Sequence, residues 1–260
     1  MQSVFDELYE NSLAKCEFKN LISIITAEEN IRLAYRNLKK NAGSRTPGTD
    51  GKTIADLAKM SEPELIGFVQ QKFNWYQPQS VRRKEIPKGN GKTRPLGIPT
   101  IMDRLIQQCV LQVMEPICEA KFCETSNGFR PNRGVENALA QAEKHMQKSN
   151  LHIVIDIDIK GFFDNVNHGK LLRQIWAMGI HDKKLLSIIS AMLKAEVAGI
   201  RYNKKGTPQG GILSPLLSNI VLNELDWWIT SQWVGMPTRH EYSGKIHENG
   251  TKDQSKKYRE

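Results

Sequence analysis

Apolar and polar side chains alternate strictly from His152 to Lys160, in the segment HIVIDIDIK. Successive side chains of a β-strand point to opposite faces, so this alternation predicts a strand whose four isoleucines share one face. Asp156 and Asp158 then lie together on the other face, near the end of the strand. We expect the isoleucines to be buried and the two carboxylates to be presented at the strand end.

A helical pattern occupies the N-terminal part of the chain. Apolar residues recur every three or four positions through the first 42 residues, which predicts helices. The Gly- and Pro-rich segment 43–53, GSRTPGTDGKT, predicts a loop that ends them. An amphipathic helix is expected from Pro63 to about Phe73, since Pro is favoured in the first turn of a helix.

Two basic, extended arms flank the turn Gly89–Asn90–Gly91 in the segment 81–100, VRRKEIPKGNGKTRPLGIPT, and predict a β-hairpin. Downstream, the pattern predicts a helix over 103–122 that is broken at Pro116. Segment 195–205 is expected to be a strand or hairpin, and the polar chain from Thr238 onward to be mobile. Further helices are predicted over 135–147, over 169–178 and after the loop that begins at Gly206.

The charge balance favours a polyanionic partner. Lys and Arg number 37 against 28 Asp and Glu, for a formal net charge of +9 in 260 residues. Within 31–52 six basic residues stand against one acid, and within 80–104 seven stand against two. An incidental surplus of surface charge is the alternative, but such concentrated stretches fit contact with a phosphate backbone better.

The sequence supports neither a metal site built on cysteines nor secretion or membrane insertion. The four cysteines (Cys16, Cys109, Cys118 and Cys123) have neither Cys-x-x-Cys spacing nor a His at metal-ligand spacing, so we interpret them as reduced thiols. No signal-peptide-like or membrane-spanning apolar run occurs. We therefore expect a cytoplasmic protein without a membrane partner.

Three strings occur in an order that resembles the reverse transcriptases encoded by group II introns. They are IPKGNGKTRPLGIPT at 86–100, DIKGFFDNVNH at 158–168 and GTPQGGILSPLLSN at 206–219, which look like the fingers hairpin, motif A and motif B. The loop TPGTDGKT and GFRPNRG at 128–134 are also similar to this family. The resemblance implies an α+β right-hand polymerase fold, with fingers and a partial palm that contains an antiparallel sheet.

The expected domains are an N-terminal helical extension and loop (1–60), fingers with the basic hairpin (61–148), partial palm (149–237) and a polar tail (238–260).

The resemblance also implies the residues of a two-metal nucleotidyl transfer site, which needs hard oxygen ligands for Mg²⁺. It makes Asp158 the motif A metal ligand, with the backbone carbonyl of Ile159 as a second contact. The alternative for Asp158 is a cap on the following turn. For Asp156 and Asp164 we favour such structural roles.

Nucleotide and nucleic-acid contacts follow in the same way from the resemblance. Phe163 matches the bulky position that crowds a ribose 2′-hydroxyl, although a core aromatic is the alternative. Lys88 and Arg94 flank the hairpin turn and are expected to bind the triphosphate of a dNTP. Gln209 is expected to position template and nucleotide, or else to cap the next helix. The expected RNA phosphate contacts are Arg82, Arg83, Lys84, Arg130 and Arg133.

The function implied is that of an RNA-directed DNA polymerase that also binds its intron RNA for splicing and retrohoming. Its partners are then an RNA template, the intron RNA and a DNA primer or target. The chain contains no Asp-Asp pair, so the Tyr-Ala-Asp-Asp hairpin of the family is missing and we expect no primer extension by this chain alone. Alternatives are an RNA-binding splicing module without polymerase activity, a diversity-generating or CRISPR-associated reverse transcriptase, and an inert remnant. The tryptophans of WWITSQW at 227–233 would favour homo-oligomers if they are exposed.

Overall fold

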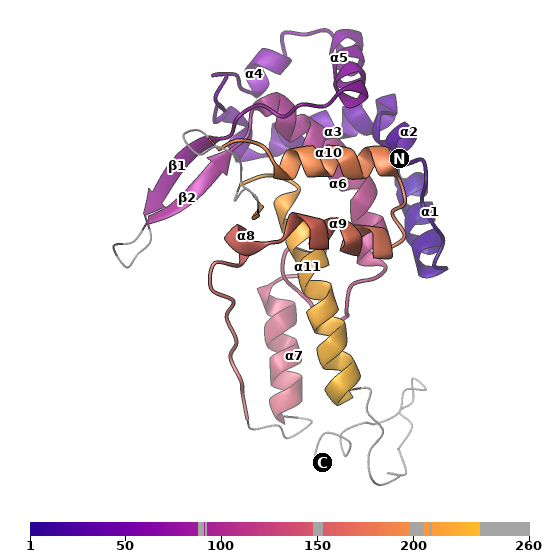
Figure 1. The fold of residues 1–260 in the computed structure, drawn as a ribbon, viewed down its shortest axis with the longest axis vertical. Helices are drawn as coiled ribbons and strands as arrows, with labels where there is room; N and C mark the ends of the chain where they lie inside the picture. The colour runs from indigo at the N-terminus through magenta and orange to yellow at the C-terminus, as the bar shows by residue number, and fades with distance from the viewer. Residues whose placement is uncertain (88–90, 92, 148–152, 198–204, 208–209, 235–260) are drawn as a thin grey trace. The chain divides into compact units, whose positions relative to one another are not determined.

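The computed structural model describes residues 1–87, 91, 93–147, 153–197, 205–207 and 210–234 (Figure 1). The chain forms two compact units. The first combines Met1–Lys121 with Gly161–Val221, and the second combines Phe122–Lys160 with the chain from Leu222 onward. Among the described helices, none has both the length and the apolar composition that crossing a membrane requires.

The core of the first unit is built around helix α6 (Ile101–Glu119), whose apolar side chains are almost all buried. Three N-terminal helices pack against it, as the pattern of the first 42 residues predicts. They are α1 (Gln2–Leu13), α2 (Leu21–Ile25) and α3 (Glu28–Lys40). The predicted break at Pro116 is wrong, because α6 continues through it. Ile117 and Cys118 are fully buried just beyond the proline, and we attribute the continuity of the helix to this packing, which outweighs the lost backbone hydrogen bond.

A buried polar network fixes α3 against α6. The Asn30 amide nitrogen donates to the carbonyl oxygens of Ile25 (2.9 Å) and Cys109 (3.1 Å). The Gln112 amide nitrogen in turn donates to the Asn30 side-chain oxygen at 2.8 Å. Asn30 is fully buried, so each of these bonds satisfies a group that has no access to water.

The loop predicted at 43–53 is present and packs on the start of α6. A Cβ on Gly48 would lie 2.6 Å from Cα of Thr100, so only glycine fits there. Arg104 donates to the carbonyl oxygens of Gly43 (2.7 Å) and Thr46 (2.6 Å) and so holds the loop from within. The loop includes the 3-10 helix η1 (Ala42–Arg45) and leads into α4 (Ile54–Leu57).

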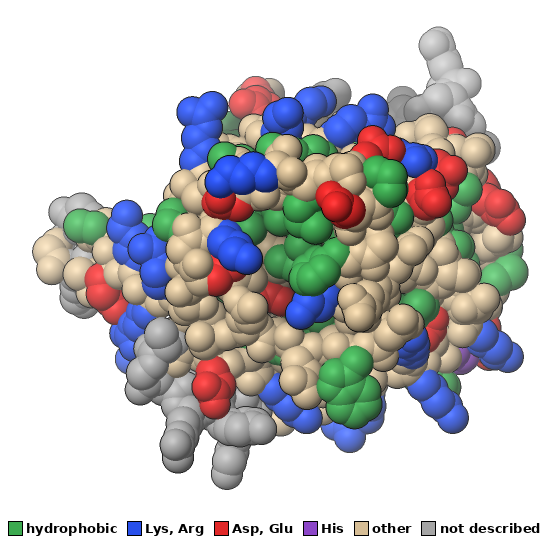
Figure 2. All heavy atoms as spheres, turned by 90° about the horizontal axis from the view of Figure 1, so that it is seen from above, with side chains coloured by type: hydrophobic (Ala, Val, Ile, Leu, Met, Phe, Trp, Pro, Cys, Tyr) green, Lys and Arg blue, Asp and Glu red, His purple; other side chains and the backbone are tan. Residues whose placement is uncertain are grey.

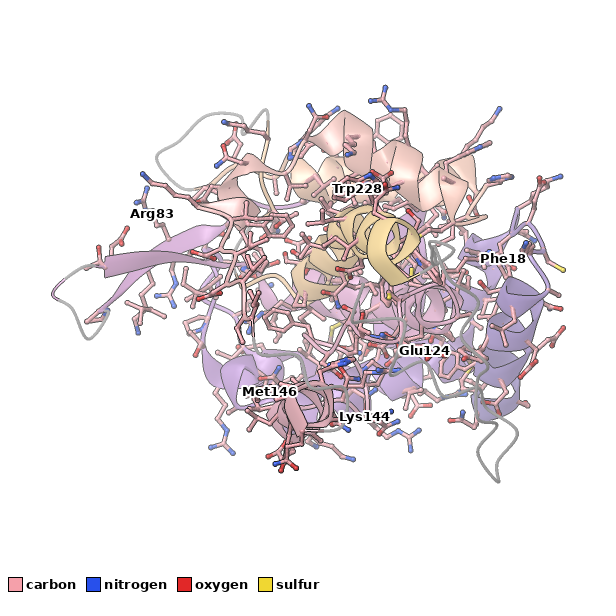
Figure 3. All side chains as sticks on the ribbon, turned by 90° about the horizontal axis from the view of Figure 1, so that it is seen from below. Phe18, Arg83, Glu124, Lys144, Met146 and Trp228 are labelled. Atoms are coloured by element: carbon pink, nitrogen blue, oxygen red, sulfur yellow. The ribbon has the colours of Figure 1, made fainter. Side chains whose placement is uncertain are left out.

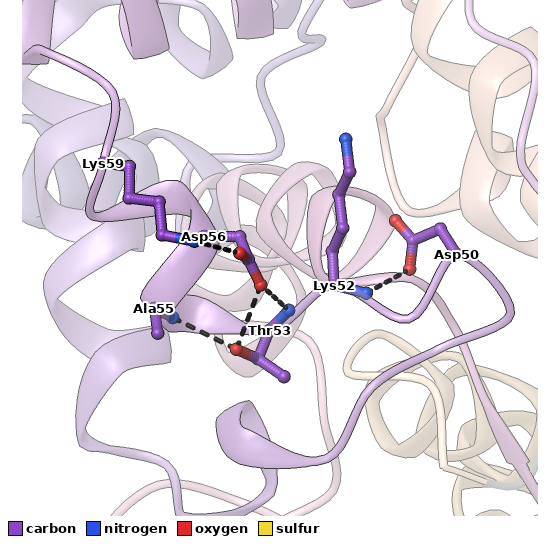
Figure 4. A network of polar contacts seen from close by, with 6 residues as sticks. All are labelled: Asp50, Lys52, Thr53, Ala55, Asp56 and Lys59. Atoms are coloured by element: carbon purple, nitrogen blue, oxygen red, sulfur yellow. Dashed lines mark hydrogen bonds and ion pairs between the residues drawn. The ribbon is translucent and has the colours of Figure 1, made fainter.

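The start of α4 carries a reciprocal cap (Figure 4). The Thr53 side chain accepts a hydrogen bond from Ala55 N, and the Asp56 carboxylate accepts one from Thr53 N at 3.0 Å. Lys59 donates to the same carboxylate at 2.8 Å. These contacts lower the pKa of Asp56 to about 2, with the Lys59 hydrogen bond as the largest cause.

Helix α5 and the hairpin follow as predicted. Pro63 lies in the first turn of α5 (Glu62–Asn74). Strands β1 (Arg82–Pro87) and β2 (Thr93–Ile98) pair antiparallel, with Arg82 opposite Ile98 and Pro87 opposite Thr93. On the face of the molecule over α4 and α5, exposed apolar side chains alternate with side chains of both charges (Figure 2).

The first unit also contains α8 (Phe162–Asn165), α9 (His168–Ala177) and α10 (Lys183–Leu193). Helix α9 confirms the prediction for 169–178, whereas α10 was not predicted. Helix α11 (Ser214–Ile229) is the helix expected after the Gly206 loop and continues into the π-helix η2 (Thr230–Val234). Of the segment expected to be a strand or hairpin, Val197 makes an isolated parallel bridge to Val81, and residues 198–204 lie outside the described residues.

In the second unit, the predicted strand at 152–160 is wrong. Residues 153–160 have irregular backbone, and Ile153, Ile155 and Ile157 are 87%, 79% and 75% exposed. A strand needs a neighbour for its backbone hydrogen bonds, and β1–β2 is the one sheet among the described residues. The isoleucine face therefore has nothing to pack on within this unit.

The helix predicted over 135–147 is α7 (Val135–Gln147), and it buries none of its residues. Figure 3 labels Lys144 and Met146 on α7 and Trp228 on α11. Trp227 and Trp228 are about half exposed, as an oligomer contact would require. The tail from Thr238 lies outside the described residues.

Candidate nucleotide and nucleic-acid site

The hairpin presents its basic arm to solvent. Arg83, labelled in Figure 3, is exposed on β1. Lys84 beside it is also exposed, and Arg82 is half-buried. Arg83 is paired with Glu85, its Nη2 lying 2.8 Å from Oε1, since side chains two apart on a strand share a face. An exposed pair of this kind contributes little to stability, so a phosphate can replace Glu85 as the partner of Arg83 at small cost.

Two of the expected triphosphate and template ligands cannot be placed. Lys88 and Gln209 lie outside the described residues, and for Arg94 the structure describes the backbone, which pairs with Ile86 in β2. Their neighbours are placed, however. Gly91 closes the hairpin turn with φ of +75°.

The end of the motif A string is anchored to the start of the motif B string. Gly206 N donates to the carbonyl oxygen of Val166 at 2.7 Å, and Thr207 N donates to that of Phe163 at 2.8 Å. The imidazole Nε2 of buried His168 lies 2.7 Å from the Gly206 carbonyl oxygen. Gly206 has φ of +96°, and a Cβ there would lie 3.1 Å from the Phe163 and Asp164 carbonyl oxygens. Glycine is therefore needed for this approach.

The motif B string also meets the base of the hairpin. A Cβ on Gly210 would lie 2.3 Å from the carbonyl oxygen of Gly97 at the end of β2. Two residues further along, Ile212 N donates to the side-chain oxygen of Gln107 in α6 at 2.8 Å. The backbone on both sides of Gln209 is thus fixed, at Thr207 on one side and at Gly210 on the other.

Phe163 is half-buried in this junction. Its ring makes an edge-to-face contact with Phe162, with centroids 5.7 Å apart, and its carbonyl oxygen is the acceptor for Thr207 N. The short helix α8 that carries both rings begins after Gly161, whose φ is +62°. In the first unit the motif B string thus contacts Phe163 of motif A through Thr207 and Gly97 of the hairpin through Gly210.

The two arginines of the GFRPNRG loop donate hydrogen bonds to backbone carbonyl groups within the second unit. Arg130 is 8% exposed, and its Nη1 donates to the carbonyl oxygens of Cys123 (2.7 Å) and Ser126 (2.9 Å). Arg133 Nη1 donates to the carbonyl oxygen of Glu124. Both side chains therefore hold the loop in shape, and their contact with RNA stays a prediction.

Asp158 and Ile159 lie in the irregular, exposed segment of the second unit. The first turn after it begins at Gly161 without a side-chain cap, so the structure shows no capping role for Asp158. Among the described residues, no group of three or more His, Cys, Asp or Glu is arranged to hold a metal ion. Asp158 alone does not make a metal site, and we derive no chemical step through a bound metal.

The sequence predicts no role for His168 or Gln107, and it counts Arg104 in the basic stretch 80–104 that was expected to contact phosphates. Each is a polar side chain that the structure buries almost completely and pairs with backbone groups. The only signal in the sequence is a polar residue inside or beside an apolar pattern. That signal does not tell which distant backbone group the side chain will reach.

Comparison with known proteins shows the family. The model of the family described as reverse transcriptase (RNA-dependent DNA polymerase) matches residues 86–247, more than half of the chain. The chain belongs to the reverse transcriptase family.

Its relatives confirm the resemblance to group II intron proteins. The group II intron-encoded protein LtrA of Lactococcus lactis subsp. cremoris is 38% identical over 235 residues, which are 87% of this chain and 38% of LtrA. Protein YkfC of Escherichia coli is 35% identical over 231 residues, which are 86% of this chain and 60% of YkfC. The chain thus spans less than two thirds of the length of these relatives.

A solved structure confirms the fold. A chain of a partial Cas6-RT-Cas1–Cas2 complex superposes with a TM-score of 0.50 and 22% identity, over 81% of this chain and 35% of that one. The predicted reverse transcriptase fold is therefore correct. The antiparallel sheet expected in the palm is not seen among the described residues, whose one sheet is the β1–β2 hairpin of the fingers.

Proposed function

We propose that this chain provides the fingers and part of the palm of an RNA-directed DNA polymerase encoded by a group II intron. Its substrates are dNTPs, an RNA template and a DNA primer or target. The same protein binds its intron RNA during splicing and retrohoming. The relatives LtrA and YkfC support this assignment, and so does the net charge of +9.

One observation carries the proposal. The motif B string makes two close contacts with segments far from it in the sequence: Thr207 N donates to the Phe163 carbonyl oxygen of motif A, and Gly210 lies against the Gly97 carbonyl oxygen at the hairpin base. Gly206 and Gly210 have positive φ, and both allow these close backbone approaches. A nucleotide-binding surface needs such pre-organised backbone.

We assign a role in nucleotide binding or catalysis to each of the predicted site residues. Lys88 and Arg94 hold the triphosphate from the hairpin, and Phe163 excludes a ribose 2′-hydroxyl. Gln209, bracketed by Thr207 and Gly210, positions the template base. Asp158 and the Ile159 carbonyl would provide oxygen ligands for Mg²⁺, and the ion would supply Lewis-acid stabilisation of charge on the reacting oxygens.

Asp158→Asn tests the polymerase assignment. The protein is expressed from the complete open reading frame that contains this sequence and assayed for extension of a DNA primer on an RNA template. Loss of an outer partner of a metal ligand costs about 10–100-fold, so loss of the ligand itself should cost at least about 100-fold. Asp156→Asn, in the same exposed segment, is the matched control and should retain activity. Equal activity of the Asp158→Asn variant and the wild type would overturn the assignment.

An RNA-binding splicing module is the second candidate, favoured by the basic arm of β1, which binds phosphates without a metal. The expected contacts are Arg82, Arg83 and Lys84, together with Arg130 and Arg133 if their loop opens. Protein that binds intron RNA with a steep salt dependence but extends no primer in the wild-type form would establish this candidate instead.

A further inference from the structure

The turn between α9 and α10 stacks an exposed tryptophan on a histidine. The Trp176 and His181 rings lie 4.1 Å apart between centroids and are inclined by 16°. Trp176 is nevertheless 40% exposed. Because His181 covers one face of the indole, the exposed area belongs to the opposite face and the edge.

The stack is held rigidly. Gly179 has φ of +92°, and a Cβ there would lie 3.0 Å from the Cys16 carbonyl oxygen. Phe18, labelled in Figure 3, donates its N–H to the Gly179 carbonyl oxygen and accepts from His181 N, both at 2.8 Å. The His181 ring itself is fixed at both nitrogens. Nε2 lies 3.1 Å from the Trp176 carbonyl oxygen, and Nδ1 lies 3.2 Å from the Glu17 carboxylate.

Basic side chains surround this stack. Trp176 and His181 line a surface cleft of about 680 Å³ together with three lysines, Lys19, Lys183 and Lys184, and two acids, Glu17 and Asp182. Glu17 is paired with Lys19 at 3.1 Å, so Lys183 and Lys184 are the cations available to a ligand. Between residues 165 and 193 the chain has four Lys or Arg and a single acid, Asp182.

Asp182 does not offset these charges at the surface. It is 5% exposed and accepts hydrogen bonds from Leu185 N (3.0 Å) and Ile22 N (3.1 Å). On α9, the exposed residues Lys170 and Arg173 precede Trp176 at intervals of three and so lie on the same side of the helix. The cleft near α4 and α5 differs, because its three acids (Asp50, Asp56 and Asp103) outnumber its two lysines, Lys52 and Lys72.

We propose that the Trp176–His181 stack and its lysines form a binding site for single-stranded RNA. A base stacks on the exposed face of Trp176, and Lys183 and Lys184 bind the flanking phosphates. An aromatic platform beside cations is the arrangement that binds single strands without sequence preference.

Other occupants fit this site less well. Base-paired RNA has no free base face to offer. A docking protein would need an apolar surround, whereas the neighbours of Trp176 in the cleft are charged. The site shares no residue with the junction of Gly97, Phe163 and Gly210, so it goes beyond the proposed polymerase function.

The test measures binding of a fluorescein-labelled oligoadenylate of about eight nucleotides, within the usual site size for single strands. A matched oligonucleotide carries abasic positions in its middle. Stacking on an aromatic side chain changes affinity about fivefold or more per base, so Trp176→Leu should weaken oligoadenylate binding by at least that factor. The same variant should leave binding of the abasic oligonucleotide almost unchanged, and Trp176→Phe should retain most of the affinity.

Two further variants complete the design. Trp75→Leu removes an indole that is 79% exposed at another place in the first unit and should not change the affinity. Lys183→Gln with Lys184→Gln should reduce the slope of log affinity against log salt by about 1.4, or about 0.7 for each phosphate that is no longer neutralised. A 4-thiouridine oligonucleotide should crosslink to the peptide that contains Trp176.

Unchanged binding by Trp176→Leu, or an equal loss for the abasic oligonucleotide, would overturn the proposal. Failure of the polymerase assignment would be seen elsewhere, in primer extension by Asp158→Asn, and the two results are independent.

Discussion

Gly210 and Gly97 lie so close that a Cβ added to Gly210 would sit 2.3 Å from the Gly97 carbonyl oxygen. Gly210 also has φ of +109°, which L-residues with a side chain rarely adopt. The contact joins the motif B loop to the hairpin base, so the position of one determines the position of the other.

Gly210→Ala should therefore lower stability by at least about 2 kcal/mol, from backbone strain and the steric conflict together. A shift of about 1 Å in positioning groups can cost about 100-fold in rate, and we expect a loss of that order in primer extension. Urea unfolding measures the first effect, and primer extension by the protein expressed from the complete open reading frame measures the second.

Gly67→Ala is the matched control. Gly67 lies within α5, and a Cβ there meets nothing within 4 Å. Alanine is the better helix former, so this variant should be more stable by about 0.5–1 kcal/mol. Equal stability of Gly210→Ala and the wild type would show that the two segments are not in contact.

Phe163→Val should relax sugar selectivity. If Phe163 crowds the ribose 2′-hydroxyl, a smaller side chain admits ribonucleotides, and the preference for dNTP over rNTP should fall at least about tenfold. The measurement is single-nucleotide incorporation with each substrate. Phe162→Val changes the other ring of the edge-to-face pair and is the control. If both variants lower the preference equally, the effect comes from disturbing α8 and the role assigned to Phe163 is wrong.

Asn30→Ala should destabilise the first unit by about 3 kcal/mol. The substitution removes the side-chain donor to the carbonyl oxygens of Ile25 and Cys109, and it removes the side-chain oxygen that accepts from the Gln112 amide. The Gln112 amide keeps its bond to the Asn30 backbone carbonyl at 3.2 Å, and each buried group left unsatisfied costs about 1–3 kcal/mol. Asn37→Ala removes a bond from an exposed side chain to the same Gln112 and should cost less than about 1 kcal/mol. Urea unfolding of both variants checks the difference, and similar losses would mean that the network does not lock α3 to α6.

Local features of this fold could be predicted from the sequence because their causes are local. The Gly-Asn-Gly turn predicts the hairpin, and Pro63 with an apolar stripe predicts α5. At Pro116 the sequence misleads, because tertiary packing decides whether a helix tolerates a proline. The alternation at 152–160 shows which residues share a face, but not whether a neighbouring strand is present to pair with that face.

Some residues of the candidate site could likewise be predicted from local sequence, and others depend on the fold. Phe163 and Asp158 lie inside contiguous motif strings, so the sequence identifies them. The contact of Gly97 with Gly210 joins residues far apart in the chain, and no periodicity reports such a distance. The third basic stretch, around α9 and α10, was missed because its charges are spread over two helices. Its importance depends on the stack of Trp176 with His181, which only the fold reveals.

The cap at the start of α4 predicts an acid-sensitive contribution to stability. In the folded protein the pKa of Asp56 is lowered to about 2 by Lys59 and Thr53, whereas an unfolded Asp titrates near about 3.9. The unfolded state therefore binds more protons between these two values. The stabilisation by Asp56 is complete above about pH 4 and is lost as the pH falls toward about 2.

Urea unfolding at a series of acidic pH values should show a shallower decline in the free energy of unfolding for Asp56→Asn than for the wild type. Asp6→Asn, which changes an exposed carboxylate on α1, is the control and should follow the wild type. Identical acid profiles for wild type and Asp56→Asn would show that the cap does not form.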